Sequence, residues 1–246
     1  MENPRYSTAR SKIPEKDSYT VLVDIEHTIY PRVDTTADAV NSYIQEKYPE
    51  TDIELTGGDL EIVNADEAVR KFSDITDWGY EPEQKFLHGH GDWPGLHEVV
   101  DTIWMVDHGR YSWLNEEHEY EPFPEARAAI EEIQQMDRVS DLEIVTSRGN
   151  WYTDTYDLET AIARKVAGDF PSIPEEKVIA EQGDKEHRGD DILVDDSLSL
   201  YKRAGEEQLV LVPLPQYNGE KVKKEVDTWV EDMDEVSHII DQILEK

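Results

Sequence analysis

Polar side chains follow three apolar runs of this chain, each at a point where a strand is expected to end. The three sets are Asp24 to Thr28, Thr146-Ser147-Arg148 and Asp195-Asp196-Ser197, and Lys185 precedes the third set. Carboxylates suit a hard cation, and a lysine suits an anionic ligand. A single acidic residue after a strand is usually structural, but three such strand ends together are harder to explain without a ligand. Because ligands of parallel α/β sheets bind beyond the carboxyl ends of the strands, we expect a ligand site here.

The apolar runs themselves have the length and β-branched content of buried parallel strands. They cover residues 19–23, 142–145, 178–180, 192–194 and 209–212. Helix-like periodicity separates or follows them at residues 124–136, 158–166 and 233–244. This alternation predicts an α/β fold in which helices flank a parallel sheet. Residues 227–231 are a candidate short edge strand.

Residues 31–123 do not continue this rhythm, and we interpret them as a helical insertion over the sheet. One amphipathic helix is expected around Ala37 to Tyr48, with Asp34 or Thr35 as its cap, and another around Ala68 to Phe72. Residues 1–18 are expected to be a polar tail. The core then consists of residues 19–30 and 124–246.

The composition limits what the protein can bind. The 246 residues include 24 Lys and Arg against 57 Asp and Glu, a formal net charge of −33. Such a charge repels phosphate backbones and anionic lipids, so duplex nucleic acid and membrane surfaces are not expected partners. The acidity is spread through the chain, which indicates a protein built for high salt, where charge repulsion is screened. An ordinary acidic protein is the alternative.

Cysteine is absent, which excludes disulfides, cysteine-ligated metals and a thiol nucleophile. No apolar run approaches the roughly 20 residues of a membrane span. The N-terminal segment lacks the apolar region of a signal peptide. We therefore expect a cytoplasmic protein.

In their order and spacing, these motifs resemble those of the haloacid dehalogenase superfamily of phosphotransferases. The first superfamily motif, a strand followed by DxDxT, reads VLVDIEHT here, with Glu26 at the second Asp. The second, a strand ending in Ser or Thr, matches LEIVTSR, and the Lys and DD motifs match DKEHRGDDILVDDS. The resemblance implies a Rossmann-like sheet with a helical cap inserted after the first strand.

Within that superfamily the chain looks most like the 5'(3')-deoxyribonucleotidases. The Thr146-Ser147 pair, the Lys185 region, the stretch LVLVPLPQYNG and Trp229 carry this likeness. It covers the core and is weak in the insertion. It implies hydrolysis of nucleoside monophosphates through an aspartyl-phosphate on Asp24.

The resemblance also assigns roles to individual residues. Glu26 takes the place of the general acid and base, and Lys185 supplies positive charge to nucleophile and phosphate. Phosphate binding falls to Thr146, Ser147 and Lys185. The implied ligands of Mg²⁺ are Asp24, the backbone carbonyl of Glu26, Asp195 and, through water, Asp196.

Three departures from the family pattern concern these roles. Glu26 has one methylene more than Asp, and a misplacement of about 1 Å can cost about 10²-fold in rate. Either the pocket suits Glu26, or turnover is slow or absent. Gly183 replaces a usual Arg, and Arg148 replaces a usual Pro. Arg148 and Arg188 could restore the positive charge, which makes Arg148 a further candidate for phosphate binding.

The insertion carries four of the six tryptophans, Trp78, Trp93, Trp104 and Trp113. A nucleobase could stack on one or two of them, or they form the core of the cap. We therefore expect a magnesium-dependent phosphatase for small phosphomonoesters. A catalytically weak or silent nucleotide-binding protein, and a phosphatase for another phosphomonoester, are the alternatives. A homodimer is left open, as is the preference for base and sugar.

Overall fold

The computed structural model covers the whole chain, which divides into two compact units. One contains residues 1–30 and 122–246, and the other contains residues 31–121. The structure describes residues 4–47, 49, 54, 56–57, 89–90, 93–94, 121–149, 157–180, 191–204, 208–214 and 219–244.

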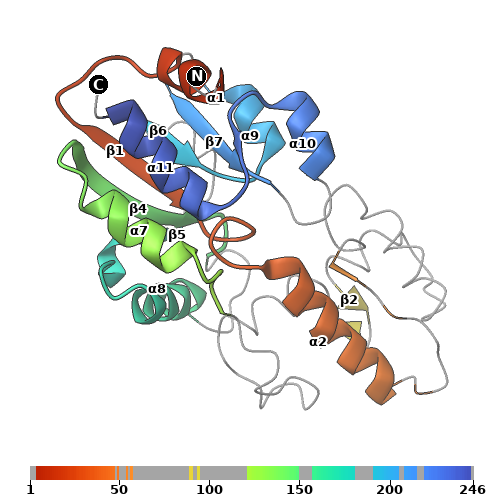
Figure 1. Cartoon of the computed structure of the whole chain (residues 1–246). Helices are drawn as coiled ribbons and strands as arrows, with labels where there is room; N and C mark the ends of the chain where they lie inside the picture. Colours follow the sequence, from red (N-terminus) through yellow and green to blue (C-terminus); the bar gives the residue numbers. More distant parts are fainter. Residues whose placement is uncertain are drawn as a thin grey trace. The chain divides into compact units, whose positions relative to one another are not determined.

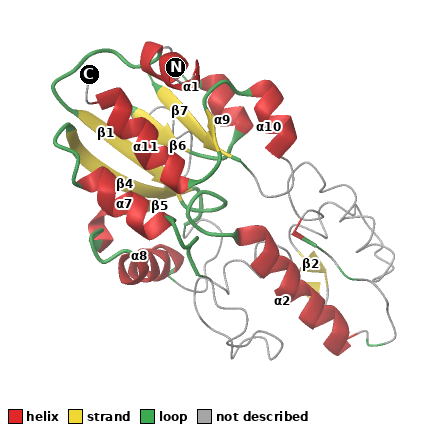
Figure 2. Ribbon diagram, in the orientation of Figure 1, coloured by secondary structure: helices red, strands yellow, loops and turns green. Residues whose placement is uncertain are grey.

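A six-stranded sheet forms the centre of the first unit (Figures 1 and 2). Its strand order is β5-β4-β1-β6-β7-β8, and every neighbouring pair is parallel. The strands are β1 (Tyr19–Asp24), β4 (Val139–Thr146), β5 (Val178–Ala180), β6 (Ile192–Val194), β7 (Leu209–Pro213) and β8 (Trp229–Val230). The predicted α/β fold with a parallel sheet is confirmed, including the short edge strand.

Helices cover both faces of this sheet because their apolar residues recur every three or four positions. Leu200 of α9 and Val222 of α10 pack against Leu22 and Leu193 of the sheet. Figure 1 shows α7 and α11 side by side on the other face, where they contact each other. The helices of this unit are α1 (Pro4–Ser11), α7 (Ala126–Gln134), α8 (Leu158–Asp169), α9 (Leu198–Arg203), α10 (Gly219–Glu225) and α11 (Met233–Leu244). Among the helices described, none is long and apolar enough to cross a membrane.

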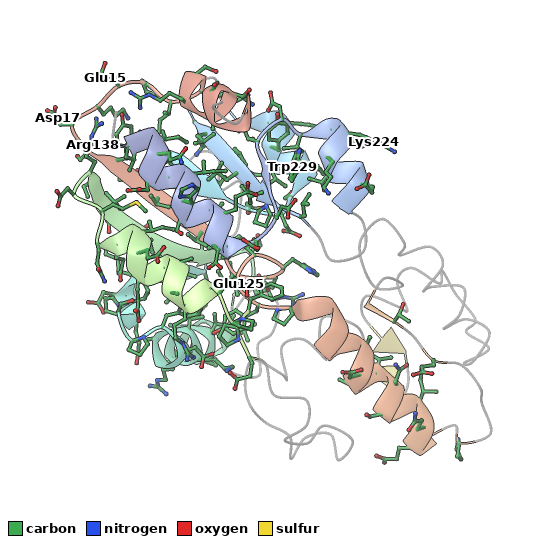
Figure 3. All side chains as sticks on the ribbon, in the orientation of Figure 1. Glu15, Asp17, Glu125, Arg138, Lys224 and Trp229 are labelled. Carbon is green, nitrogen blue, oxygen red and sulfur yellow. The ribbon has the colours of Figure 1, made fainter. Side chains whose placement is uncertain are left out.

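The N-terminal segment differs from the expected polar tail, because it contains helix α1 and packs on the core. Ala9 and Ile13 are buried. The Arg10 guanidinium donates to the carbonyl of Ile243 at 2.9 Å, at the C-terminal end of α11. Arg138, labelled in Figure 3, donates to the next carbonyl, that of Leu244, at 2.6 Å. Both arginines donate to carbonyls at the end of α11, where the last carbonyls of a helix have no hydrogen-bond partner within that helix.

The second unit contains helix α2 (Arg32–Lys47) and a two-stranded antiparallel pair, β2 (Gly89–His90) with β3 (Trp93–Pro94). The expected helix is present, but it begins earlier, so Asp34 and Thr35 lie inside it and not before its first residue. The strand pair was not expected in a helical insertion. The helix expected around Ala68 to Phe72 lies outside the described residues.

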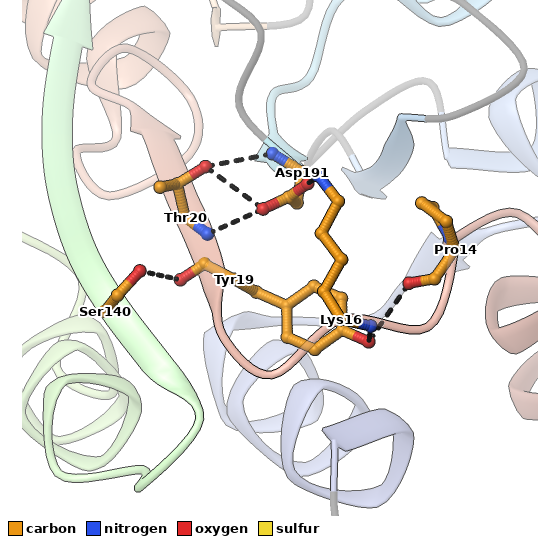
Figure 4. A network of polar contacts seen from close by, with 6 residues as sticks. All are labelled: Pro14, Lys16, Tyr19, Thr20, Ser140 and Asp191. Carbon is orange, nitrogen blue, oxygen red and sulfur yellow. Dashed lines mark hydrogen bonds and ion pairs between the residues drawn. The ribbon is translucent and has the colours of Figure 1, made fainter.

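The amino end of the sheet is held together by Asp191, the residue before β6 (Figure 4). Its carboxylate accepts hydrogen bonds from the backbone N–H of Thr20 at 3.0 Å and from the Thr20 hydroxyl at 3.4 Å. The ammonium of Lys16 forms an ion pair with the other carboxylate oxygen. The Asp191 carbonyl also accepts from the N–H of Leu209. Asp191, whose side chain is 8% exposed, thereby joins the starts of β1, β6 and β7.

Replacing this carboxylate should destabilise the sheet. We expect Asp191→Ala to lower the free energy of unfolding by about 1–3 kcal/mol, because the half-buried Thr20 N–H and the Lys16 ammonium lose their acceptor. Urea unfolding measures the change. The matched control is Asp137→Ala at an exposed turn, which should stay within about 0.5 kcal/mol of wild type. Equal stability of Asp191→Ala and the control would contradict the role given to Asp191.

A second polar cluster attaches the N-terminal segment to the far edge of the sheet. The Lys12 ammonium lies 2.9 Å from a carboxylate oxygen of Asp227 and 3.2 Å from the Tyr201 hydroxyl, which itself donates to Asp227. Burial acts to raise the pKa of Asp227, but the hydrogen bonds from Tyr201 and Lys12 outweigh it and lower that pKa. Burial likewise acts to lower the pKa of Lys12, and the bonds to Asp227 and Tyr201 together raise it.

This cluster makes stability depend on pH in a defined direction. Because the pKa of Asp227 is lowered in the folded protein, its contribution is present above the unfolded pKa of about 3.9 and disappears as the pH falls through the folded pKa. Asp227→Asn should cost less than about 1 kcal/mol at pH 7, since the side chain is 55% exposed. The difference from wild type should vanish in acid. Urea unfolding from pH 2 to pH 8 checks this, and a difference that persists at pH 2 would contradict it.

Candidate active site

Three strand ends meet at the carboxyl edge of the sheet, where the sequence predicted a ligand site. Strand β1 lies between β4 and β6, with Asp24 opposite Val145 and Val23 opposite Val194. The residues that follow these positions are therefore neighbours across the sheet. Thr146 ends β4, and Asp195 follows β6 directly.

Three carboxylates converge at this edge. Asp24, Asp195 and Asp196 each offer an oxygen atom, and these atoms lie within 4.8 Å of one another. Asp24 is 4% exposed and Asp195 is 2% exposed. At that separation and an effective dielectric constant of about 20, each pair repels by about 3.5 kcal/mol. A hard divalent cation would offset this repulsion, and oxygen ligands of this kind suit Mg²⁺. The donor set therefore fits a magnesium ion.

Backbone hydrogen bonds hold Asp195 in place. The N–H of Ser197 donates to a carboxylate oxygen of Asp195 at 2.8 Å. The Ser197 hydroxyl in turn caps helix α9 by accepting from the N–H of Leu200 at 3.3 Å. The start of α9 and the orientation of Asp195 thus depend on the same short turn.

The turn after β1 aims the next acidic side chain inward. His27 has a φ of 62°, in the left-handed region that few residues other than glycine adopt. Its N–H donates to the carbonyl of Tyr30 at 2.9 Å, and the N–H of Ile29 donates to the carbonyl of Ile25 at 3.0 Å. In this compact turn Glu26 is 7% exposed and Thr28 is 1% exposed. Strain of this kind is often found at functional sites.

The buried carboxylate of Glu26 is engaged by two groups from the end of β4. The Nε atom of Arg148 lies 3.0 Å from its Oε1 atom, and the Thr146 hydroxyl donates to Oε2 at 3.0 Å. The same hydroxyl accepts from the backbone N–H of Arg148 at 3.0 Å. Thr146 and Arg148 are 0% and 4% exposed. Arg148, expected as a phosphate ligand, thus contacts the residue expected to be the acid and base.

This pairing was not anticipated from the sequence. Glu26 and Arg148 were both noted as departures from the family pattern, but each was interpreted alone. The sequence does contain a signal for the pair. An acid one methylene longer than the usual Asp follows one strand, and a basic residue that the family lacks follows an adjoining strand. The structure shows that the two departures are in contact.

The remaining candidate residues are only partly described. Ser147 is exposed in the loop after β4. Lys185 lies outside the described residues, as do Trp78, Trp104 and Trp113, and Trp93 is described only as part of strand β3. Their roles in phosphate and base binding therefore stay predictions.

The strand order, with acidic residues at the carboxyl ends of the central strands, defines a haloacid dehalogenase-like fold. The structure is similar to a crystal structure of a haloacid dehalogenase-type hydrolase of family IA, variant 3, from Entamoeba histolytica, with a TM-score of 0.53 and 12% identity. The alignment covers 93% of this chain and all of that one. At this identity the likeness shows the fold alone.

An L-2-haloacid dehalogenase also aligns, over 91% of this chain and 98% of its own, with 12% identity. Its TM-score of 0.33 is too low to support an argument. No family model matches the sequence, and no curated protein is significantly similar to it.

Mg²⁺ should stabilise the folded protein through the three carboxylates. At a concentration about 100 times its dissociation constant, a ligand that binds the folded state raises the free energy of unfolding by about 2.7 kcal/mol. We expect Asp195→Asn to be more stable than wild type without metal, because one repelling charge is gone, and to lose most of the response to Mg²⁺. Thermal unfolding with and without MgCl₂ measures both effects.

The control for this experiment is Asp17→Asn, which removes an exposed carboxylate from the loop before β1 (Figure 3). It should keep the full response to Mg²⁺. An equal response in Asp195→Asn and Asp17→Asn would show that the metal acts only as a general counterion.

Proposed function

We propose that this protein is a magnesium-dependent phosphomonoester hydrolase with Asp24 as its nucleophile. The observation that carries the proposal is the position of Asp24: a buried carboxylate at the carboxyl end of a central strand, beside Asp195 and Asp196. Asp24 and its two neighbours suit a cation that would neutralise the charge of a phosphate group. A carboxylate oxygen can then approach phosphorus.

The proposed reaction has two displacements. Glu26 leaves Arg148 and takes a proton from solvent before the first displacement. A carboxylate oxygen of Asp24 then attacks phosphorus, the bond from phosphorus to the ester oxygen breaks, and Glu26 gives its proton to the departing alkoxide. Water then gives a proton to Glu26 and attacks the phosphorus of the aspartyl-phosphate. The bond from phosphorus to the Asp24 oxygen breaks, which frees Asp24 and releases inorganic phosphate. The metal would supply charge stabilisation during both displacements. Residues 31–121, the second compact unit, are proposed as the cap that excludes bulk water.

We propose nucleoside monophosphates as the substrates. The support is the likeness of LVLVPLPQYNG and Trp229 to the 5'(3')-deoxyribonucleotidases. Trp229 belongs to β8, which pairs with β7 at Val212. The role proposed for Asp24 does not depend on this choice of substrate, because hydrolysis of another small phosphomonoester would use the same nucleophile.

The contact between Glu26 and Arg148 favours a second candidate function. A carboxylate that remains bound to a buried guanidinium cannot carry a proton to the leaving group. A protein in which this pair never separates would bind a nucleotide without hydrolysing it. Turnover distinguishes the two candidates.

The test is phosphate release from nucleoside 5'- and 3'-monophosphates in molar KCl, with and without Mg²⁺. The high salt is chosen because the net charge of −33 requires screening. We expect metal-dependent release that falls by at least about 10³-fold in Asp24→Asn. Release that is equal in Asp24→Asn would exclude Asp24 as nucleophile. No release from folded wild-type protein would favour the silent nucleotide-binding protein.

A further inference from the structure

The Glu26 carboxylate uses the hydrogen-bond donors that a bound phosphate group would need. The Thr146 hydroxyl and the Arg148 side chain were expected to face phosphoryl oxygens. Both instead lie 3.0 Å from the two carboxylate oxygens of Glu26. The extra methylene of Glu, compared with Asp, extends its carboxylate from the turn after β1 toward the end of β4.

The donor capacity at this point is limited. The Thr146 hydroxyl has one proton, and its oxygen already accepts the N–H of Arg148, so the proton is directed to Glu26. The Nε atom of Arg148 forms an ion pair with the other carboxylate oxygen, Oε1, at 3.0 Å. A phosphate oxygen can accept the Thr146 proton, and take the place of Glu26 beside Arg148, only when Glu26 has moved away.

Because Arg148 is buried, replacing the Glu26 carboxylate by another anion is more favourable than removing Glu26 without a replacement. A guanidinium that is 4% exposed is costly without an anionic partner. Glu26 provides that partner in this structure, and a phosphate group could provide it in the complex. The guanidinium would then be balanced by an anion in both states.

We propose that Glu26 competes with phosphate for the Thr146 hydroxyl and the Arg148 guanidinium. Phosphate that takes these donors displaces the Glu26 carboxylate, which becomes free to face the leaving group. Glu26 therefore weakens the binding of phosphate while it serves turnover. This inference rests on the proposed phosphate site, and it adds to that site a competitor contributed by the chain itself.

The experiment measures the affinity of inorganic phosphate by isothermal titration calorimetry, in molar KCl with Mg²⁺. We expect Glu26→Gln to bind phosphate at least tenfold more tightly than wild type, because the neutral amide is displaced more easily than a carboxylate. Turnover should fall in the same variant. Competition predicts that phosphate affinity rises while turnover falls, whereas damage to the site would lower both.

Two further variants test the cause of the gain in affinity. Glu131→Gln removes an exposed carboxylate from α7 and should leave the affinity unchanged, which controls for the altered net charge. The double variant Glu26→Gln/Arg148→Gln should lose the gain in affinity, because the guanidinium is absent. If Glu26→Gln does not fold, Glu26→Asp replaces it: the shorter side chain keeps its charge but cannot reach both donors, so a smaller gain is expected.

The outcomes separate this inference from the proposed function. Tighter phosphate binding in Glu26→Gln supports competition even where wild type hydrolyses nothing in the substrate panel. Equal or weaker binding in Glu26→Gln overturns competition even where wild type is an active phosphatase. A gain that persists in the double variant, or an absence of phosphate binding in every variant, also overturns it.

Discussion

Repulsion among three carboxylates is the constraint on which the candidate active site depends. Asp24, Asp195 and Asp196 are brought within 4.8 Å of one another because they end or follow adjacent parallel strands. The fold therefore concentrates negative charge at one edge of the sheet. The amino end of the sheet, opposite to this site, is held by Asp191. Its hydrogen bonds to Thr20 and its ion pair with Lys16 oppose separation of β1 from β6.

Acidic residues exceed basic ones by 33 in this chain, so most carboxylates cannot have a basic side chain as partner. Two buried carboxylates are paired with specific cations: Glu26 with Arg148 and Asp191 with Lys16. In the pair of Glu26 and Arg148 both side chains are buried, so removing either partner is strongly destabilising and restricts which charges can move. The Glu26 carboxylate can therefore leave Arg148 only when another anion takes its place.

The sequence predicted the core elements because their signals are local. Runs such as residues 192–194 and 209–212 are apolar and β-branched, and they became β6 and β7. Helix α1 was missed because its sequence PRYSTARS is polar and its burial depends on contacts with α11. The pair of Glu26 and Arg148 was missed for a similar reason. It requires the left-handed backbone at His27 and joins strand ends about 120 residues apart.

Binding and hydrolysis are separable properties of this site. Arg148 and the Thr146 hydroxyl favour an anion whether or not Asp24 reacts, because a buried guanidinium must be neutralised. Hydrolysis requires more: Glu26 must leave those donors and reach the ester oxygen. The fold, shared with a hydrolase at 12% identity, does not decide between these states; they differ in whether Glu26 leaves Arg148 when an anion binds.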